Sequence, residues 1–152
     1  MQMKRHMIDL ELVVIINSAE EFVRLRLSEN VDDYLRAARE EANIYIWLEV
    51  IGKYPDLKYW VAHNTTVQME VLEVLSDDLC WQVRHMVASK NKLSEELQIK
   101  LANDRDPSVR QRIVNNKRAT ISALLVLSKD EELEIKEMAL KKLAKLGFYK
   151  NV

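Results

Sequence analysis

WQVRHMVASKNKLSEELQIKLANDRD, residues 81–106, is the stretch that decides the fold, because residues 107–132, PSVRQRIVNNKRATISALLVLSKDEE, repeat its pattern 26 positions later. Residues 55–80 follow the same pattern, and LEIKEMALKKL opens a fourth unit at residue 133. A fixed period of this length is typical of proteins that stack one small structural unit on the next. The sequence therefore predicts four 26-residue repeats over residues 55–146, the last of them partial.

Residues that stand 26 positions apart share their chemistry. Within a unit the apolar residues recur at i, i+4 in the first half and again in the second, which is the spacing of one helical face. Each unit is therefore expected to be a helical hairpin that must bury its apolar face against its neighbours. The apolar columns are Leu57, Val83, Val109 and Ile135; Val61, Val87, Ile113 and Ala139; and Ala62, Ala88, Val114 and Leu140.

Helix starts are marked at the expected places. Asp106 precedes Pro107, which places an N-cap residue before a proline at the first helical position. Thr66, Ser94 and Thr120 precede the second helices of their units, where hydroxyl side chains can cap the first turn. The sequence contains only two glycines and two prolines, so we expect almost no strand.

The repeat loosens upstream of residue 55. Residues 43–54 match a second helix if the offset shortens by about two residues, so that Trp47 and Ile51 take the positions of Val71 and Leu75. Residues 18–21 form a capping box, with Ser first and Glu last, ahead of a further helix. We interpret residues 1–54 as degenerate N-terminal capping units of a single domain that spans residues 1–152.

These repeats resemble the HEAT-like α-solenoids, and most closely the leucine-rich-repeat variant, whose units read roughly VAxNxxxPxxxLxxLAxDxDxxVR. The matching strings are VAHNTTVQMEVLEVLSDD from residue 61, VASKNKLSEELQIKLANDRDPSVR from residue 87 and VNNKRATISALLVLSKD from residue 114. The resemblance implies an all-α fold, an α-α superhelix of stacked hairpins of HEAT/ARM type. It also implies a scaffold for binding protein or nucleic acid, without chemistry of its own.

The chain departs from that family pattern in two respects. The proline that usually opens the second helix is replaced by Val67, Leu93 and Ala119 or their neighbours. A cysteine cluster that accompanies the repeat in one iron–sulfur protein is missing here, because Cys80 is the only cysteine. The helix-start geometry predicted from the family is therefore open, and an iron–sulfur function is excluded.

The composition and the N-terminal stretch bear on localisation. A single cysteine permits no intramolecular disulfide, which fits a reducing compartment. The chain begins with basic residues followed by an apolar stretch, but Asp9 and Glu11 interrupt it and the uninterrupted apolar run, residues 12–16, is too short to span a membrane. We expect a cytoplasmic protein with a helical or partly extended lead-in and no membrane segment.

Charged residues recur at the same positions of successive units. Acidic residues end each unit and basic residues begin the next, so a structural ladder that links the units is the favoured interpretation, because partly buried charges need partners. Contacts to a ligand are the alternative. The pairs, in chain order, are Asp78 with Arg84, Asp104 with Arg110, and Asp130 with Lys136.

Two surfaces remain after the scaffold is accounted for. The loops between the two helices of each unit should lie side by side, which would bring Lys90, Lys92, Lys117 and Arg118 together on a basic edge able to receive phosphate or an acidic helix. A solvated loop is the plainer alternative for these cations. The second surface is a column that would line an apolar groove if it faced a partner rather than the core. It consists of Trp60, Met86, Arg112 and Met138.

Nothing in the sequence points to catalysis. His6, His63 and His85 lack the spacing of metal ligands, and Cys80 stands alone beside Trp81. No glycine-rich phosphate loop and no Ser–His or paired-carboxylate arrangement can be singled out. We expect no enzymatic activity, no metal and no cofactor; the enzymatic alternative, a base-flipping DNA-repair protein of similar architecture, would need an acid in a basic cleft.

The charge distribution favours a binding role. Residues 1–80 hold 8 Lys/Arg and 15 Asp/Glu, a net charge of −7, whereas residues 81–152 hold 15 and 9, a net charge of +6. Such a field favours oriented docking or head-to-tail self-association. The leading hypothesis is a protein–protein interaction module, and the alternative is a nucleic-acid-binding repeat protein that uses the basic edge.

Overall fold

The structure, a computed structural model, describes residues 15–148, so the expected lead-in lies almost wholly outside the described residues. Within this range the chain is mostly helical, and none of the described helices is long and apolar enough to cross a membrane. The helices alternate between two layers. One layer holds α1 (Ala19–Leu27), α3 (Ile44–Lys53), α5 (Met69–Leu75), α7 (Glu95–Ala102) and α9 (Ile121–Leu127). The other holds α2 (Val31–Arg39), α4 (Lys58–His63), α6 (Trp81–Ala88), α8 (Pro107–Asn115) and α10 (Leu133–Lys145).

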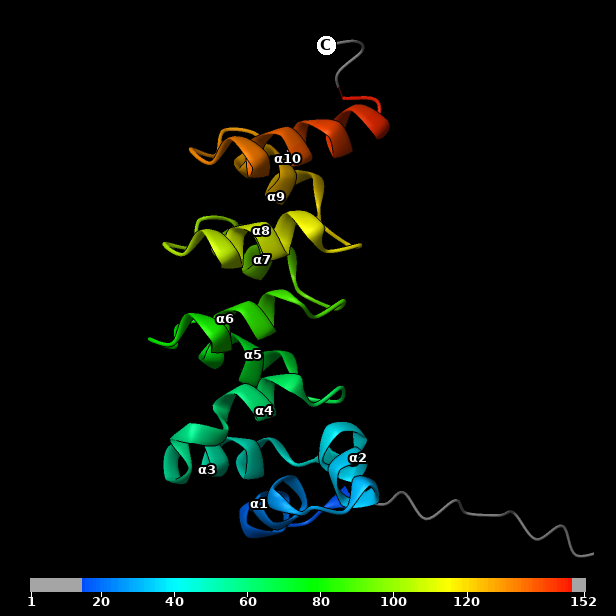
Figure 1. Ribbon diagram of the computed structural model, residues 1–152, viewed down its shortest axis with the longest axis vertical. Helices are drawn as coiled ribbons and strands as arrows, with labels where there is room; N and C mark the ends of the chain where they lie inside the picture. Colours follow the sequence, from blue (N-terminus) through cyan, green and yellow to red (C-terminus); the bar gives the residue numbers. More distant parts are fainter. Residues whose placement is uncertain (1–14, 149–152) are drawn as a thin grey trace, which may run out of the picture.

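Successive hairpins stack along the long axis of the molecule (Figure 1). In one layer α4 packs on α6, α6 on α8 and α8 on α10, and in the other α7 packs along α9. By contrast the backbones of α5 and α7 approach each other less closely, and Figure 1 shows them more widely spaced than α7 and α9. The helix α2 lies out of line with the other members of its layer and packs on α1.

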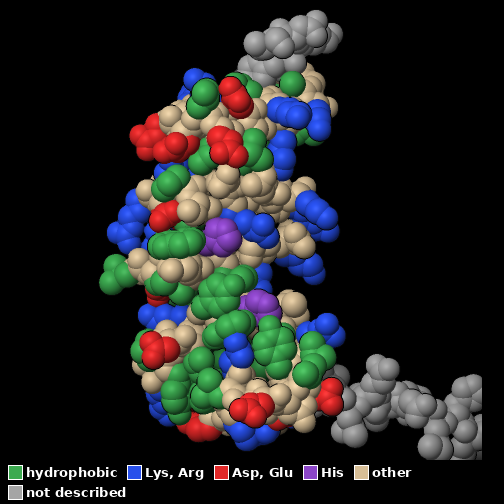
Figure 2. Space-filling model, in the orientation of Figure 1, with side chains coloured by type: hydrophobic (Ala, Val, Ile, Leu, Met, Phe, Trp, Pro, Cys, Tyr) green, Lys and Arg blue, Asp and Glu red, His purple; other side chains and the backbone are tan. Residues whose placement is uncertain are grey.

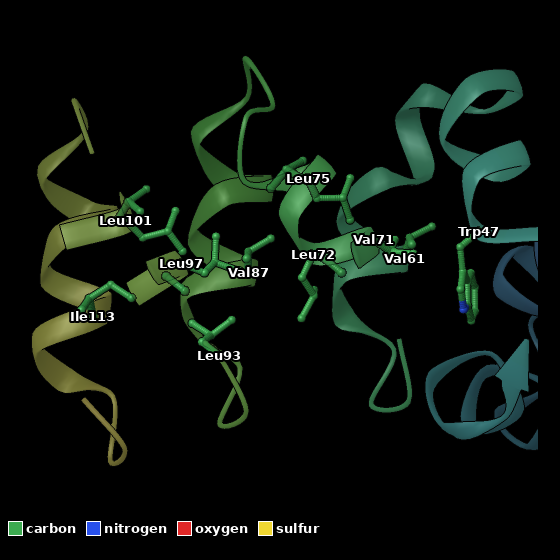
Figure 3. Packing of buried hydrophobic residues seen from close by; sticks show 14 of the residues in the cluster. Trp47, Val61, Val71, Leu72, Leu75, Val87, Leu93, Leu97, Leu101 and Ile113 are labelled. Carbon is green, nitrogen blue, oxygen red and sulfur yellow. The ribbon is translucent and has the colours of Figure 1, made fainter. Parts of the chain in front are cut away.

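The buried side chains come from the repeated apolar columns (Figure 3). Val61, Val87, Ile113 and Ala139, which form one column, are all fully buried. Burial of a side chain of this size contributes about 1.5–3 kcal/mol relative to leaving it exposed, so the column holds consecutive hairpins together. The core therefore runs along the axis between the two layers.

The N-terminal part follows the period more closely than the sequence indicates. Trp47 is buried in α3 and meets Phe22 of α1 edge to face, with ring centroids 5.1 Å apart. Val50, not Ile51, is the second fully buried residue of α3, so the prediction for Ile51 is wrong. The offset from Trp47 and Val50 to the buried Leu72 and Leu75 is 25, one less than the main period.

Two short strands were not foreseen. β1 (Ile15–Ile16) pairs in parallel with β2 (Glu41–Ala42), with Ile15 opposite Glu41 and Ile16 opposite Ala42. Both pairs are 26 positions apart, so the strands are the loop segments of two neighbouring units laid side by side. A 3₁₀ turn, η1 (Pro55–Leu57), leads into α4.

Most predicted helix caps are confirmed. Ser94 and Thr120 accept hydrogen bonds from the backbone N–H groups three residues on, and Asp106 caps α8 ahead of Pro107. The cap predicted at Thr66 is wrong, because α5 begins after Gln68, whose side chain makes no capping bond. Thr66 lies in the loop, two residues before the N-cap position of α5. Its hydroxyl donates to the side chain of Asn64.

Candidate binding surface

Buried ion pairs lie within the hairpins. The guanidinium of Arg84 donates to both carboxylate oxygens of Asp104, at 2.7 and 2.9 Å, and Arg110 does the same to Asp130, at 2.8 and 3.1 Å. The side chains of both pairs are less than a tenth exposed. Lys58 makes the corresponding contact to Asp78 at 2.9 Å. The base and the acid are thus 20 residues apart, inside one unit.

This geometry corrects the pairing read from the sequence, which joined Asp78 to Arg84 and Asp104 to Arg110. Those residues do meet, but Arg84 donates to the backbone carbonyl of Asp78 at 2.7 Å, and Arg110 to that of Asp104 at 2.9 Å. The acidic side chains are turned away because each also accepts the backbone N–H two residues on. In the pair predicted from Asp130, Lys136 is exposed and makes no ion pair within residues 15–148.

The pKa values of these groups follow from burial and pairing. Burial by itself would raise the pKa of Asp104, but the hydrogen bonds from Arg84 and from the Asp106 backbone outweigh it and leave the pKa below its usual value. The same balance lowers the pKa of Asp130. The pairs are therefore ionised at neutral pH, and their charges are used within the scaffold.

A second column links the loops. Position 64 and its equivalents 26, 52 and 78 residues later hold Asn64, Lys90, Asn116 and Lys142. The amide of Asn64 donates to the carbonyls of residues 37 and 40, and that of Asn116 to those of residues 88 and 90. The ammonium of Lys90 donates to the carbonyls of His63 and Asn64, at 3.1 and 2.6 Å, and Lys142 to that of Asn116 at 3.0 Å. Two residue types thus perform one task, satisfying the carbonyl groups of the preceding loop.

The sequence predicts that Lys90 is one of the cations of an exposed basic edge. The structure instead places its ammonium in contact with the preceding loop. This ammonium reaches back to the α4–α5 loop, where it is held by the carbonyl groups of His63 and Asn64. Burial lowers the pKa of Lys90 to about 8. Sequence columns alone could have raised this possibility, because Lys90 stands where two neighbouring units carry a loop-bonding asparagine.

The buried Lys90 predicts a specific pH dependence of stability. In the unfolded chain its pKa is near 10.4, so between about pH 8 and 10.4 the unfolded chain holds a proton that the folded chain has released. The free energy of unfolding should then rise with pH across this window, by about 2–3 kcal/mol relative to Lys90→Asn. Urea unfolding of both proteins at pH 7 and pH 10 measures the difference. Parallel changes in the two proteins would show that Lys90 is not desolvated.

The other predicted members of the basic edge are exposed. Lys92 lies in the loop between α6 and α7, and Lys117 and Arg118 lie in the loop between α8 and α9. Lys141 and Lys145, exposed near the end of α10, were missed because α10 continues as a helix where the earlier units have a loop. Figure 2 shows Lys and Arg side chains along this edge of the visible face, without acidic side chains between them in its upper part.

The column predicted to line a groove lies on one layer, with Trp60 on α4, Met86 on α6, Arg112 on α8 and Met138 on α10. Trp60 is partly buried, and several side chains contact its ring. The guanidinium of Arg26 lies 3.3 Å from the centre of its ring, and the rings of Tyr34, Tyr59 and His63 surround it at 5.0–6.4 Å. Arg112 is exposed, and the two methionines are partly buried. The four residues thus share one layer, and a groove along them stays a prediction.

The two histidines of the described part are partly buried, and its cysteine is exposed. The pKa of His63 is lowered, first by burial and then by Lys90 and Arg26, so its ring is neutral at pH 7. The pKa of His85 is lowered by burial and by Arg112. Cys80 is exposed and lies against the side-chain oxygen of Gln82. Among residues 15–148 no three His, Cys, Asp or Glu side chains form a group that could hold a metal ion, and His6 lies outside them.

A cavity of about 510 Å³ opens between the α4–α5 loop and the α6–α7 loop. Its apolar lining comes from Met69, Leu72 and Met86. Its polar lining includes the imidazole of His63 and the ammonium groups of Lys90 and Lys92. The cavity thus joins one member of the predicted groove, Met86, to two members of the predicted basic edge. It is the place where the two surfaces proposed from the sequence meet.

Comparison of the chain with protein-family models, curated proteins and solved structures gives no match.

Proposed function

We propose that this protein is a non-enzymatic binding scaffold, a short HEAT-like α-solenoid of the leucine-rich-repeat-variant type, and that its partner is another protein. The recurring charged and amide side chains support the proposal, because they are used in contacts between hairpins. Arg84, Arg110, Asn64 and Asn116 are all buried and bonded within the scaffold. Side chains committed in this way hold a surface in place and do not act on a substrate.

The observation that carries the proposal is the cavity between the α4–α5 and α6–α7 loops. Its apolar lining lies beside exposed cations on a rigid edge, which is the combination found in protein interfaces, where an apolar anchor is surrounded by a polar rim. Contiguous features of this kind on a surface mark interaction sites more often than scattered apolar residues do. We infer that the partner docks on the loop edge.

Binding of nucleic acid is the second candidate, favoured by one observation. Lys92, Lys117 and Arg118 are exposed on neighbouring loops, where they can reach successive phosphate groups. With three such contacts the affinity should be weak and should fall steeply as salt increases. Titration against duplex and single-stranded DNA and RNA at about 50 mM salt tests this directly.

Reversing two charges on the edge should remove partner binding. We expect the double variant Lys92→Glu, Lys117→Glu to bind its partner at least about tenfold more weakly, because both cations lie on the proposed docking edge. The control is Lys129→Glu, Lys136→Glu, which makes the same change of charge at exposed positions elsewhere. Affinity capture from an extract of the source cells, followed by titration of the recovered protein, measures the loss.

The two possible classes of partner give different patterns. A recovered protein that binds the wild type and the control alike but not the edge variant supports the proposal. Equal recovery by all three proteins would contradict it. Binding of oligonucleotide that the edge variant loses, with no protein recovered, would establish the second candidate instead.

A further inference from the structure

We propose that the cavity between the α4–α5 and α6–α7 loops takes an apolar side chain from an acidic segment of the partner, whose carboxylates pair with Lys92, Lys117 and Arg118. The inference rests on the proposed function and adds the chemistry of the partner. This cavity differs from the same place one unit further along.

In the next unit the equivalent gap is closed by one buried side chain. Gln98 of α7 donates to the backbone carbonyls of Leu93 and Arg118, at 3.3 and 3.2 Å, and accepts from the backbone N–H of Thr120 at 2.8 Å. These bonds fasten α7 and its loop to the loop and first turn of α9. The close packing of α7 along α9 follows from this bridge.

The residue in the Gln98 column one unit earlier is Leu72, which cannot make such a bridge. Accordingly the backbones of α5 and α7 approach each other less closely than those of α7 and α9, and the space between the loops stays open, although Lys100 of α7 bonds Ser76 at the end of α5. At two further positions of the lining, an apolar residue also stands where the next unit has a polar one. Met69 is in the column of Glu95, and Met86 is in the column of Arg112. Three polar residues of one gap are thus replaced by apolar residues in the other, which makes this gap an apolar receptacle.

The charges around the cavity select an acidic ligand. The ammonium of Lys90 is occupied by two carbonyl groups, and the ring of His63 is neutral because burial lowers its pKa. Lys92 is therefore the exposed cation at the mouth, with Lys117 and Arg118 on the adjoining loop. A second cavity between α5 and α7, of about 430 Å³, is lined by Glu73, Asp77, Glu96 and Lys100; Lys100 pairs with Asp77, and the two remaining carboxylates would repel an acidic segment.

The lining favours a peptide over a nucleic acid. Proteins that bind single strands supply aromatic rings on which bases stack, and among the described residues no Trp, Tyr or Phe lines this cavity, whose one aromatic ring is the imidazole of His63. That ring already contacts the indole of Trp60, one face of which is covered by Arg26. Methionine and leucine side chains instead accept aliphatic or aromatic side chains of varied shape. An apolar anchor with acidic neighbours matches both the lining and the rim.

The test uses three fluorescein-labelled probes of equal net charge: an acidic peptide with a central leucine, the same peptide with a central alanine, and a single-stranded oligonucleotide. Fluorescence anisotropy with the full chain should show the leucine peptide binding at least about tenfold more tightly than the alanine peptide. Equal binding of the two peptides, binding of neither, or tighter binding of the oligonucleotide would overturn the inference.

Two variants address the cavity itself. Leu72→Gln copies Gln98 and should close the gap, so the preference for leucine should disappear; because Leu72 is itself buried, the melting temperature is measured to check that the variant folds. If that variant does not fold, Met69→Glu, which copies Glu95 at a partly exposed position, should weaken leucine-peptide binding by repulsion. Retention of the preference in a folded variant would also overturn the inference. Failure of these probes leaves the capture experiment with the edge variant unaffected, so the two proposals fail separately.

Discussion

Replacing Arg84 by alanine should lower the free energy of unfolding by about 3–5 kcal/mol, because it leaves the carboxylate of Asp104 buried without its partner. The guanidinium also satisfies the carbonyls of Asp78 and Leu79, so three groups lose a donor at once. A domain of this size is stable by only about 5–15 kcal/mol, and such a loss should move the urea midpoint substantially.

Two further variants serve as controls for Arg84→Ala. Arg84→Lys restores the arrangement of the preceding unit, where Lys58 bonds Asp78, and should recover part of the loss. Arg112→Ala removes an exposed arginine from the neighbouring helix and should change the free energy of unfolding by less than about 0.5 kcal/mol. Equal losses for Arg84→Ala and Arg112→Ala would show that the buried pair does not stabilise the fold.

The paired carboxylates also set the acid limit of the protein. The pKa of Asp104 is lowered in the folded chain because the hydrogen bonds from Arg84 and the Asp106 backbone outweigh the effect of burial. Its stabilising contribution is thus complete above its unfolded pKa, near 3.9, and is lost as the pH falls through the lower folded value. The ladder contributes nothing to a change of stability above neutral pH, and between about pH 8 and 10.4 the group to follow is Lys90, whose pKa burial lowers to about 8.

Much of the helical architecture was predictable, because a repeated apolar column has one physical explanation. Val61, Val87, Ile113 and Ala139 must all face the core if the units are alike, and all are fully buried. The helix starts at Ser94 and Thr120 were predictable for the same reason, since the cap uses a local side chain. At Thr66 the local signal misled, because a hydroxyl near a helix start can equally bond a neighbouring loop residue.

The surface was harder to predict, because a long polar side chain can turn either outward or back onto the chain. Lys90 and Lys92 are two residues apart in one loop, yet one is bound by carbonyl groups and the other is exposed. The Asp78 carboxylate likewise pairs with Lys58 and not with Arg84, because its hydrogen bond from the Cys80 backbone N–H fixes the direction of the side chain. The cavity depends on the difference between Leu72 and Gln98, and its significance appears only when the bonds of Gln98 are known.

The second large effect is expected at Asn64, a fully buried amide that joins two units. Asn64→Ala should lower the free energy of unfolding by about 2–4 kcal/mol, because it removes the donors to the carbonyls of Ala37 and Glu40 and the acceptor for Thr66. Urea unfolding compares it with Asn103→Ala, which removes an exposed asparagine that bonds only its own helix.

Asn64→Lys distinguishes the bridge between loops from a general effect of altering a buried site. Lys90 and Lys142 occupy the same column and donate to the carbonyls of the preceding loop, so a lysine at position 64 can restore these bonds. It cannot replace the acceptor for Thr66, since an ammonium has none, and we expect it to recover about half of the loss. If lysine is no better than alanine here, while Lys90→Asn is tolerated, the two residue types are not interchangeable in this column and the shared role assigned to them is wrong.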